Sequence, residues 1–282
     1  MKKSMLFPLL TAVGGAGAFL LRLVQRATGF EADTGLPIPG NLPAMALVLW
    51  FVVLAAAAFF AARALLPAEG EDSPLFPDGF STASAGLLTL TVMGILLLAV
   101  SGAADIASGI FPGQLVISAD GTTAPLQDRF FSQKESLILG ALSLVSAASL
   151  FPAVPACRVR QAGERKPFQG ALLLVPVCCL VVRVVLTYRA ESSDPSLIGY
   201  YPDILAMVFL TLAFYRLSAF AFRAGRSRRF ALYTALAAAF CLAALADRPD
   251  PARMAFYAGG ALTLFGFLLQ RTAALAAPRS ES

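Results

Sequence analysis

Long, uninterrupted apolar segments constrain the fold of this chain more than any other feature. A helix that crosses a bilayer needs about 20 mostly apolar residues, because the hydrocarbon core is ~30 Å thick. Eight such segments occur, at 6–24, 44–66, 83–104, 137–156, 168–186, 204–222, 230–246 and 254–269. They lack the alternating pattern of short strands that is typical of a membrane β-barrel. The sequence therefore predicts an all-α, polytopic integral membrane protein with about eight transmembrane helices.

The composition agrees with this class. Hydrophobic residues make up 58% of the chain and charged residues 14%, whereas soluble domains have roughly 45–50% and ~25%. The first segment follows a basic start, MKK, and ends near small residues, which resembles a secretory signal. Its apolar run continues to position 21, and the internal repeat that the sequence predicts includes this segment as one of its helices. We therefore expect it to remain as the first span.

Basic loops predict the orientation of the chain in the membrane. Cytoplasmic loops of membrane proteins carry an excess of Lys and Arg. The strongest clusters are CRVRQAGERK at 157–166 and RAGRSRR at 223–229, which lie on the same side as both termini if there are eight spans. The sequence predicts cytoplasmic N- and C-termini in the cell membrane. The basic loops fit contact with anionic lipid better than nucleic-acid binding.

Two polar loops indicate an internal repeat. The loop after the first span and the loop after the fifth each follow an arginine near a helix end, Arg22 or Arg183. Two spans after each of these arginines, an aspartate ends a predicted span. Asp105 ends the third span and Asp247 ends the seventh. This order predicts a parallel 4+4 duplication, with halves at 1–156 and 157–282. The halves would be related by a pseudo-twofold axis along the membrane normal.

The aligned charges form the candidate binding site. We hypothesise that Arg22, Arg183, Asp105 and Asp247 line an outward-facing cavity between the halves. The hypothesis places at its rim Asp203, Tyr188, Tyr200 and Tyr201. Two arginines can hold a small anionic or zwitterionic solute through fork-like hydrogen bonds. The alternative is that Arg–Asp pairs only tie the helices together.

The sequence offers no support for an enzyme. It contains no histidine, which excludes H-E-x-x-H zinc proteases and Ser–His catalysis. No glycine-rich nucleotide motif occurs either, so we expect no catalytic residues, no cofactor and no metal site. The four cysteines fit small packing positions.

The loop TGLPIPGN after the first span resembles loops in uncharacterised multi-pass membrane proteins of bacteria. This resemblance covers only the N-terminal hairpin and implies no activity. The favoured function is a small-solute permease with its site between the halves. The alternative is a non-transporting scaffold or regulatory subunit that binds a partner protein through the acidic loop 67–82 or the loop 111–135. A third reading, a lipid-modifying enzyme, would require carboxylates that converge at headgroup depth.

Overall fold

The computed structural model describes residues 3–30, 38, 40–67, 74–111, 115–117, 123–125, 133–158, 169–191, 201–247 and 249–276. Within them, eight helices are long and apolar enough to span a membrane. This confirms the predicted all-α class and indicates a multi-pass membrane protein. The helices are α1 (Leu6–Thr28), α2 (Leu42–Leu65), α3 (Ala85–Ile110), α4 (Gln133–Leu150), α6 (Val175–Glu191), α7 (Tyr201–Ser218), α8 (Ser227–Ala246) and α9 (Pro251–Ala276).

Shorter elements lie at the helix ends and in the loops. The short helices are η1 (Lys3–Met5), η2 (Asp78–Phe80), α5 (Ala153–Ala156), η3 (Gly170–Leu174) and η5 (Ala219–Phe222). Within the loop 111–135, β1 (Leu115–Ile117) pairs antiparallel with β2 (Thr123–Pro125). The α4–α5 and η3–α6 segments each count as one candidate span.

Most spans extend beyond the predicted apolar segments, and the third and the eighth extend furthest. The third continues from Ala104 to Ile110, and the eighth runs from Pro251 to Ala276 instead of 254–269. Polar residues occupy these extensions, but Asp105, Gln270 and Arg271 are each less than a tenth exposed. Their side chains face neighbouring helices, so hydropathy alone underestimates the helix lengths.

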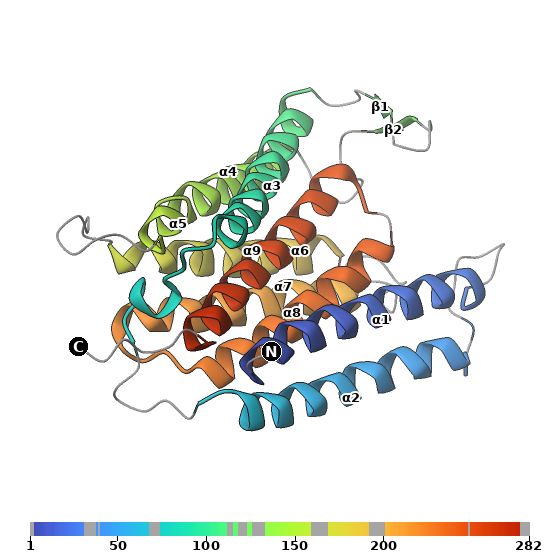
Figure 1. The fold of residues 1–282 in the computed structure, drawn as a ribbon. Helices are drawn as coiled ribbons and strands as arrows, with labels where there is room; N and C mark the ends of the chain where they lie inside the picture. The colour runs from blue at the N-terminus through green and yellow to red at the C-terminus, as the bar shows by residue number, and fades with distance from the viewer. Residues whose placement is uncertain are drawn as a thin grey trace, which may run out of the picture.

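Helices α8 and α9 form the centre of the bundle (Figure 1). Helix α8 packs against α1, α2, α7 and α9, whereas α3 packs mainly along α4 and α9. Accordingly, 72% of the most apolar stretch of α8 is buried, against 17% for α2, so the described residues leave most of the surface of α2 uncovered. Under the predicted repeat α3 corresponds to α8, yet their surroundings differ. The repeat stays a prediction.

Glycines bring α3 and α9 into close contact. A Cβ atom added to Gly259 would lie 2.7 Å from the backbone nitrogen of Leu98, and one added to Gly94 would lie 2.5 Å from that of Thr263. Small residues at such crossings let helix backbones approach each other, which favours packing in lipid. The backbone hydrogen bonds of both helices remain internal.

The two ends of the bundle differ in their side chains. Helix α1 begins where α9 ends, because the Ser4 hydroxyl donates to the carbonyl oxygen of Thr272 at 3.2 Å. This end is called the phenylalanine end and contains Phe76, Phe80, Phe220, Phe230 and Phe267. The opposite end is called the paired-charge end and contains Arg22, Asp105, Arg183, Asp203, Asp247 and Arg253.

Candidate functional site

An ion pair joins α1 to the end of α8. The Arg22 side chain is buried and donates from Nε to Oδ1 of Asp247 at 2.9 Å and from Nη2 to Oδ2 at 3.0 Å. Its third nitrogen, Nη1, donates to the Gln25 amide oxygen at 2.9 Å. The guanidinium thus has a partner at each nitrogen, and the two-point contact has the geometry that makes arginine–carboxylate pairs strong.

Asp247 lies just beyond the last turn of α8 and is partly exposed. Burial raises the pKa of the Asp247 carboxyl, and the hydrogen bonds and positive charge of Arg22 oppose this rise without cancelling it. Next to it, Arg26 donates to the carbonyl oxygen of Ala246 at 3.1 Å. A cation at this position interacts favourably with the negative end of the helix dipole. Both arginines of α1 therefore hold the end of α8.

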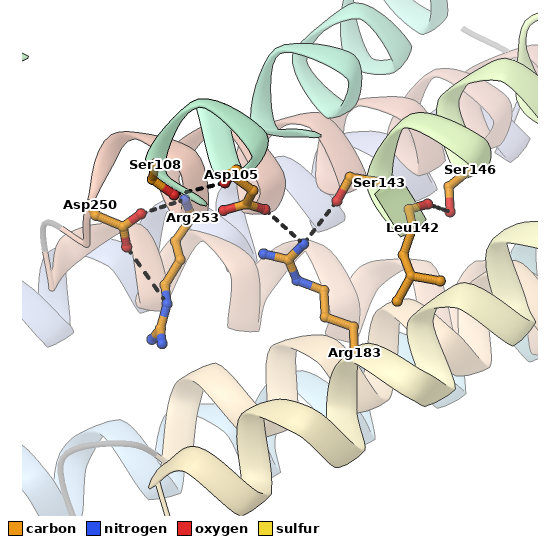
Figure 2. A network of polar contacts seen from close by, with 8 residues as sticks. All are labelled: Asp105, Ser108, Leu142, Ser143, Ser146, Arg183, Asp250 and Arg253. Carbon is orange, nitrogen blue, oxygen red and sulfur yellow. Dashed lines mark hydrogen bonds and ion pairs between the residues drawn. The ribbon is translucent and has the colours of Figure 1, made fainter. Parts of the chain in front are cut away.

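The second predicted arginine, Arg183 of α6, contacts three other helices. Its Nη1 donates to the Ser143 hydroxyl of α4 at 2.8 Å and lies 3.4 Å from Oδ2 of Asp105 on α3. The guanidinium also lies over the ring of Phe256 on α9, at 3.9 Å from the centroid. Figure 2 shows Arg183 reaching from α6 toward Asp105 and Ser143. The side chain is only 5% exposed.

A third charged group lies at the start of α9. Arg253 forms ion pairs with Asp203 of α7, at 3.5 Å, and with Asp250, at 3.6 Å. Asp250 also accepts a hydrogen bond from the Arg253 backbone nitrogen at 3.3 Å (Figure 2), as an N-cap residue does. Asp203 and Arg253 are each 7% exposed. The group joins the beginnings of α7 and α9.

The structure distributes the predicted site residues among these three groups. Each of the two aligned arginines pairs with the aspartate of the other predicted half: Arg22 with Asp247, and Arg183 with Asp105. Asp203 joins a group of its own with Arg253. Of the predicted rim tyrosines, Tyr188 and Tyr201 are exposed on α6 and α7, and Tyr200 lies outside the described residues.

A narrow cavity follows Arg183 toward the middle of the bundle. It has a volume of about 20 Å³, which is room for about one water molecule. Helices α3, α4, α6, α7 and α9 each contribute to its wall, mostly with apolar side chains, and its polar lining comes from Arg183, Ser143 and Ser146. In this conformation the cavity is too small for an organic solute.

Aromatic side chains fill the phenylalanine end. The ring of Phe80 meets those of Phe220, Phe230 and Phe267 in edge-to-face contacts, with centroids 5.0 to 6.1 Å apart. The backbone nitrogen of Phe76 donates to the Phe220 carbonyl oxygen at 3.0 Å. The segment 74–82, part of the loop to which the alternative function assigns partner binding, thus inserts Phe76 and Phe80 into the bundle.

A buried arginine fixes this segment. Arg271 of α9 is 4% exposed and donates from Nη1 to the carbonyl oxygen of Gly79 and from Nε to the hydroxyl of Ser227, both at 2.7 Å. A buried guanidinium needs such acceptors, because its desolvation is costly. Arg271 therefore connects η2, α8 and α9.

Sequence reasoning missed three contributors to the charged groups: Arg253, Ser143 and Phe256. Arg253 precedes the predicted eighth span, which begins at 254. Its position one turn before Phe256 would have placed both on one face of α9. Ser143 carries no such signal, since serines are common in membrane helices. Within the described residues, no group of three or more His, Cys, Asp or Glu side chains could hold a metal ion.

No protein-family model matches the chain, and neither a curated protein nor a solved structure does.

Proposed function

We propose that this protein is a small-solute transporter of the cell membrane, in a conformation closed at both ends. One observation carries the proposal: the buried Arg183 lines a cavity whose wall is formed by five helices. An ionisable residue within a membrane bundle marks a functional site by default. The solute would be small and anionic or zwitterionic.

The energetics of the ion pairs support a role in function. Desolvation of two charges often exceeds their mutual attraction, so a buried pair contributes little stability over apolar residues of similar size. Three arginine–aspartate groups nonetheless occur at the paired-charge end. Such pairs are well suited to a contact that must break and re-form, because water can solvate both partners once the helices separate.

The two ends would form the two gates that alternating access requires. At the paired-charge end, Arg253–Asp203 joins α9 to α7. At the phenylalanine end, Phe80 is completely buried among rings from η5, α8 and α9. The basic cluster 223–229 belongs to the phenylalanine end, so the positive-inside rule supports a cytoplasmic location for it and for both termini.

Two native cysteines give a direct test. Cys179 lines the cavity, whereas its neighbour Cys178 is exposed on the outer surface of α6. Each would be kept as the single cysteine, with the other three replaced by serine or alanine. Intact cells would then be treated with a charged, membrane-impermeant thiol reagent. We expect Cys179 to react, because water enters the cavity when the paired-charge end opens. Cys178 should resist, because it faces lipid.

Absence of labelling at Cys179 would contradict the proposal, provided that single cysteines at positions 33 and 194 react as loop controls. It would favour the alternative, a non-transporting scaffold or regulatory subunit. One observation supports that alternative: α2 is the least buried span and exposes large apolar side chains such as Met45 and Phe60. A partner helix could pack there, and cross-linking from α2 would detect it.

A further inference from the structure

Arg216 of α7 differs from the buried arginines of the bundle, which are Arg22, Arg183, Arg253 and Arg271. Each of those four pairs with a carboxylate or donates to a hydroxyl or carbonyl oxygen. Arg216 forms no ion pair within the described residues. Its Nε is buried and has no hydrogen-bond partner there. A buried donor without an acceptor is costly, so an acceptor from outside the described residues would stabilise Arg216.

Two tyrosine rings hold the guanidinium group of Arg216. Its central carbon lies 5.3 Å from the ring centroid of Tyr215 and 5.6 Å from that of Tyr233 on α8, which is within the range of cation–π attraction. Helices α7 and α8 lie side by side (Figure 1), and Tyr215 is 47% exposed at their surface. The rings thus position the cation, but they supply no oxygen acceptor to its N–H groups.

Arg216 and Tyr233 lie at the same depth near the phenylalanine end. Arg216 is six residues before Phe222, where its span ends, and Tyr233 is six residues after Ser227, where the next span begins. Six residues of helix correspond to about 9 Å. Tyrosine is enriched where the hydrocarbon meets the headgroups, and a long arginine side chain extends toward them. The lipid phosphates of this leaflet therefore come within reach of Arg216.

Further positive charge lies at the start of α8. Arg226 and Arg229 are exposed, and Arg229 lies one turn before Tyr233 on the same face of the helix. No ion pair of the described residues includes either arginine. The first turn of α8 contains no acidic residue, and the helix dipole disfavours cations at this end. An anion at this surface would relieve both effects.

An apolar face continues from Arg216 into the span. Leu212 and Phe209, four and seven residues earlier on α7, are partly exposed and share a face with Arg216. The ring of Phe209 stacks on Phe240 of α8, with centroids 5.0 Å apart, and Phe240 stacks on Phe51 of α2 at 3.9 Å. The cation is thus followed along the bundle by an apolar surface that suits an acyl chain.

We propose that Arg216 binds the phosphate of an anionic phospholipid whose acyl chain lies along α7. An arginine fork matches two phosphate oxygens, while Tyr215 and Tyr233 fix its position and Arg229 adds charge. A zwitterionic headgroup carries a cation that the neighbouring arginines repel, so an anionic headgroup is preferred. The site belongs to the cytoplasmic leaflet if the termini are cytoplasmic. It is separate from the central cavity and does not depend on transport.

The test measures lipid binding to the purified full-length protein by native mass spectrometry in a neutral detergent. The probes are phosphatidylglycerol, which is anionic, and phosphatidylethanolamine, which is zwitterionic, with identical acyl chains. We expect one phosphatidylglycerol molecule to bind about tenfold more tightly than phosphatidylethanolamine, because arginines near the membrane surface attract anionic lipid. Equal affinities for the two lipids would overturn the proposal.

Variants of Arg216 test the residue itself. We expect R216Q to lose the preference for phosphatidylglycerol and to keep the unfolding midpoint of the parent in neutral detergent, since no ion pair of the described residues is broken. R216K, which keeps the charge but not the fork, should keep part of the preference. R229Q changes an exposed side chain, so it leaves the interior intact, and should weaken the preference by about threefold. An unchanged preference in both R216Q and R229Q would refute the site.

R63Q is the matched control on α2. Arg63 is exposed, and its guanidinium lies over the ring of Phe59 at 4.9 Å from the centroid. It belongs to the same end of the bundle, because Arg228 of α8 donates to the Leu66 carbonyl oxygen at 2.9 Å. R63Q should bind phosphatidylglycerol as the parent does. A loss as large as that in R216Q would mean that only the total charge of this end matters.

A soluble phosphate compound is the other source of the same chemistry. Glycerol phosphate, added at millimolar concentration in place of lipid, carries the phosphate without acyl chains. We expect it neither to bind measurably nor to displace phosphatidylglycerol, because the apolar face of α7 contributes to lipid binding. If glycerol phosphate binds as tightly as the lipid and R216Q abolishes this binding, the site holds a soluble phosphate and the lipid assignment is wrong.

Discussion

Arg22 and Asp247 meet through two nitrogens and two oxygens, at 2.9 and 3.0 Å, and so join α1 to the end of α8. Arg183 and Asp105, which occupy the aligned positions, share only one contact of 3.4 Å. The first pair is therefore the stronger tie between helices.

Replacing one partner of the Arg22–Asp247 pair should destabilise the protein more than replacing both. R22Q leaves Asp247 without its cation, and we expect a loss of about 2–3 kcal/mol in the free energy of unfolding. This is below the ~3–5 kcal/mol typical of completely buried pairs, because the Asp247 side chain is 23% exposed. The double variant R22Q/D247N should recover more than half of the loss, as measured by unfolding in detergent or bicelles.

Arg189, whose side chain is 71% exposed and pairs with Glu135, provides the control for that cycle. The variant R189Q should change stability by less than ~1 kcal/mol, because exposed ion pairs contribute little. A loss in R22Q no larger than in R189Q would show that the Arg22–Asp247 pair does not hold α1 to α8.

Asp247 should take up a proton at a higher pH than an exposed aspartate, because burial raises its pKa. The ion pair with Arg22 is present above that pKa and is lost as the pH falls through it. Infrared difference spectra between the parent and D247N, recorded over a pH series, isolate the protonated carboxyl band of this residue. A band that develops only in the ordinary range of aspartate or below it would contradict the assigned environment.

The phenylalanine cluster should tolerate little loss of volume. F80A removes a completely buried ring, and we expect a cost of about 3–5 kcal/mol, as for other buried aromatic residues. Phe60 on α2 is 66% exposed, so F60A is the matched control and should cost less than ~1 kcal/mol. Comparable losses in the two variants would mean that Phe80 is not part of the packed interior.

The crossing of α3 and α9 should be sensitive to a single methyl group. In G259A the new Cβ would lie 2.7 Å from a backbone nitrogen and 2.9 Å from a backbone oxygen of α3, so the helices must move apart. We expect a loss of about 1–3 kcal/mol, the usual effect of overpacking. G86A is the control, since its Cβ would meet only the Ser84 hydroxyl at 4.0 Å. If G259A is as stable as the parent, the close contact of α3 with α9 is wrong.

The apolar segments alone were sufficient to predict the all-α class and the eight helices of the described residues that are long and apolar enough to span a membrane. The predicted ends of the spans were less accurate. Gln270 and Arg271 looked like the polar residues beyond a span, yet both lie inside α9 and are buried. A hydropathy pattern does not distinguish a polar residue that faces water from one that faces another helix.

The charged residues of the site could be identified from the sequence, since Arg22 and Arg183 are conspicuous within apolar segments. Their partners depended on which helices pack together, which sequence spacing does not specify. The segment 67–82 looked like an exposed acidic loop because its charges dominate the pattern. Its phenylalanines instead fill the end of the bundle, and only the fold provides the rings that surround them.

The crosswise pairing has a consequence for assembly. Residues 1–156 contain Arg22 and Asp105, and residues 157–282 contain their partners, Asp247 and Arg183. A chain cut between α5 and η3 would therefore give two fragments, each with an arginine and an aspartate that lack their partners in lipid. Neither fragment should accumulate alone. When the two fragments are produced together, they should associate and restore the folded protein, as the parts of a split protein do.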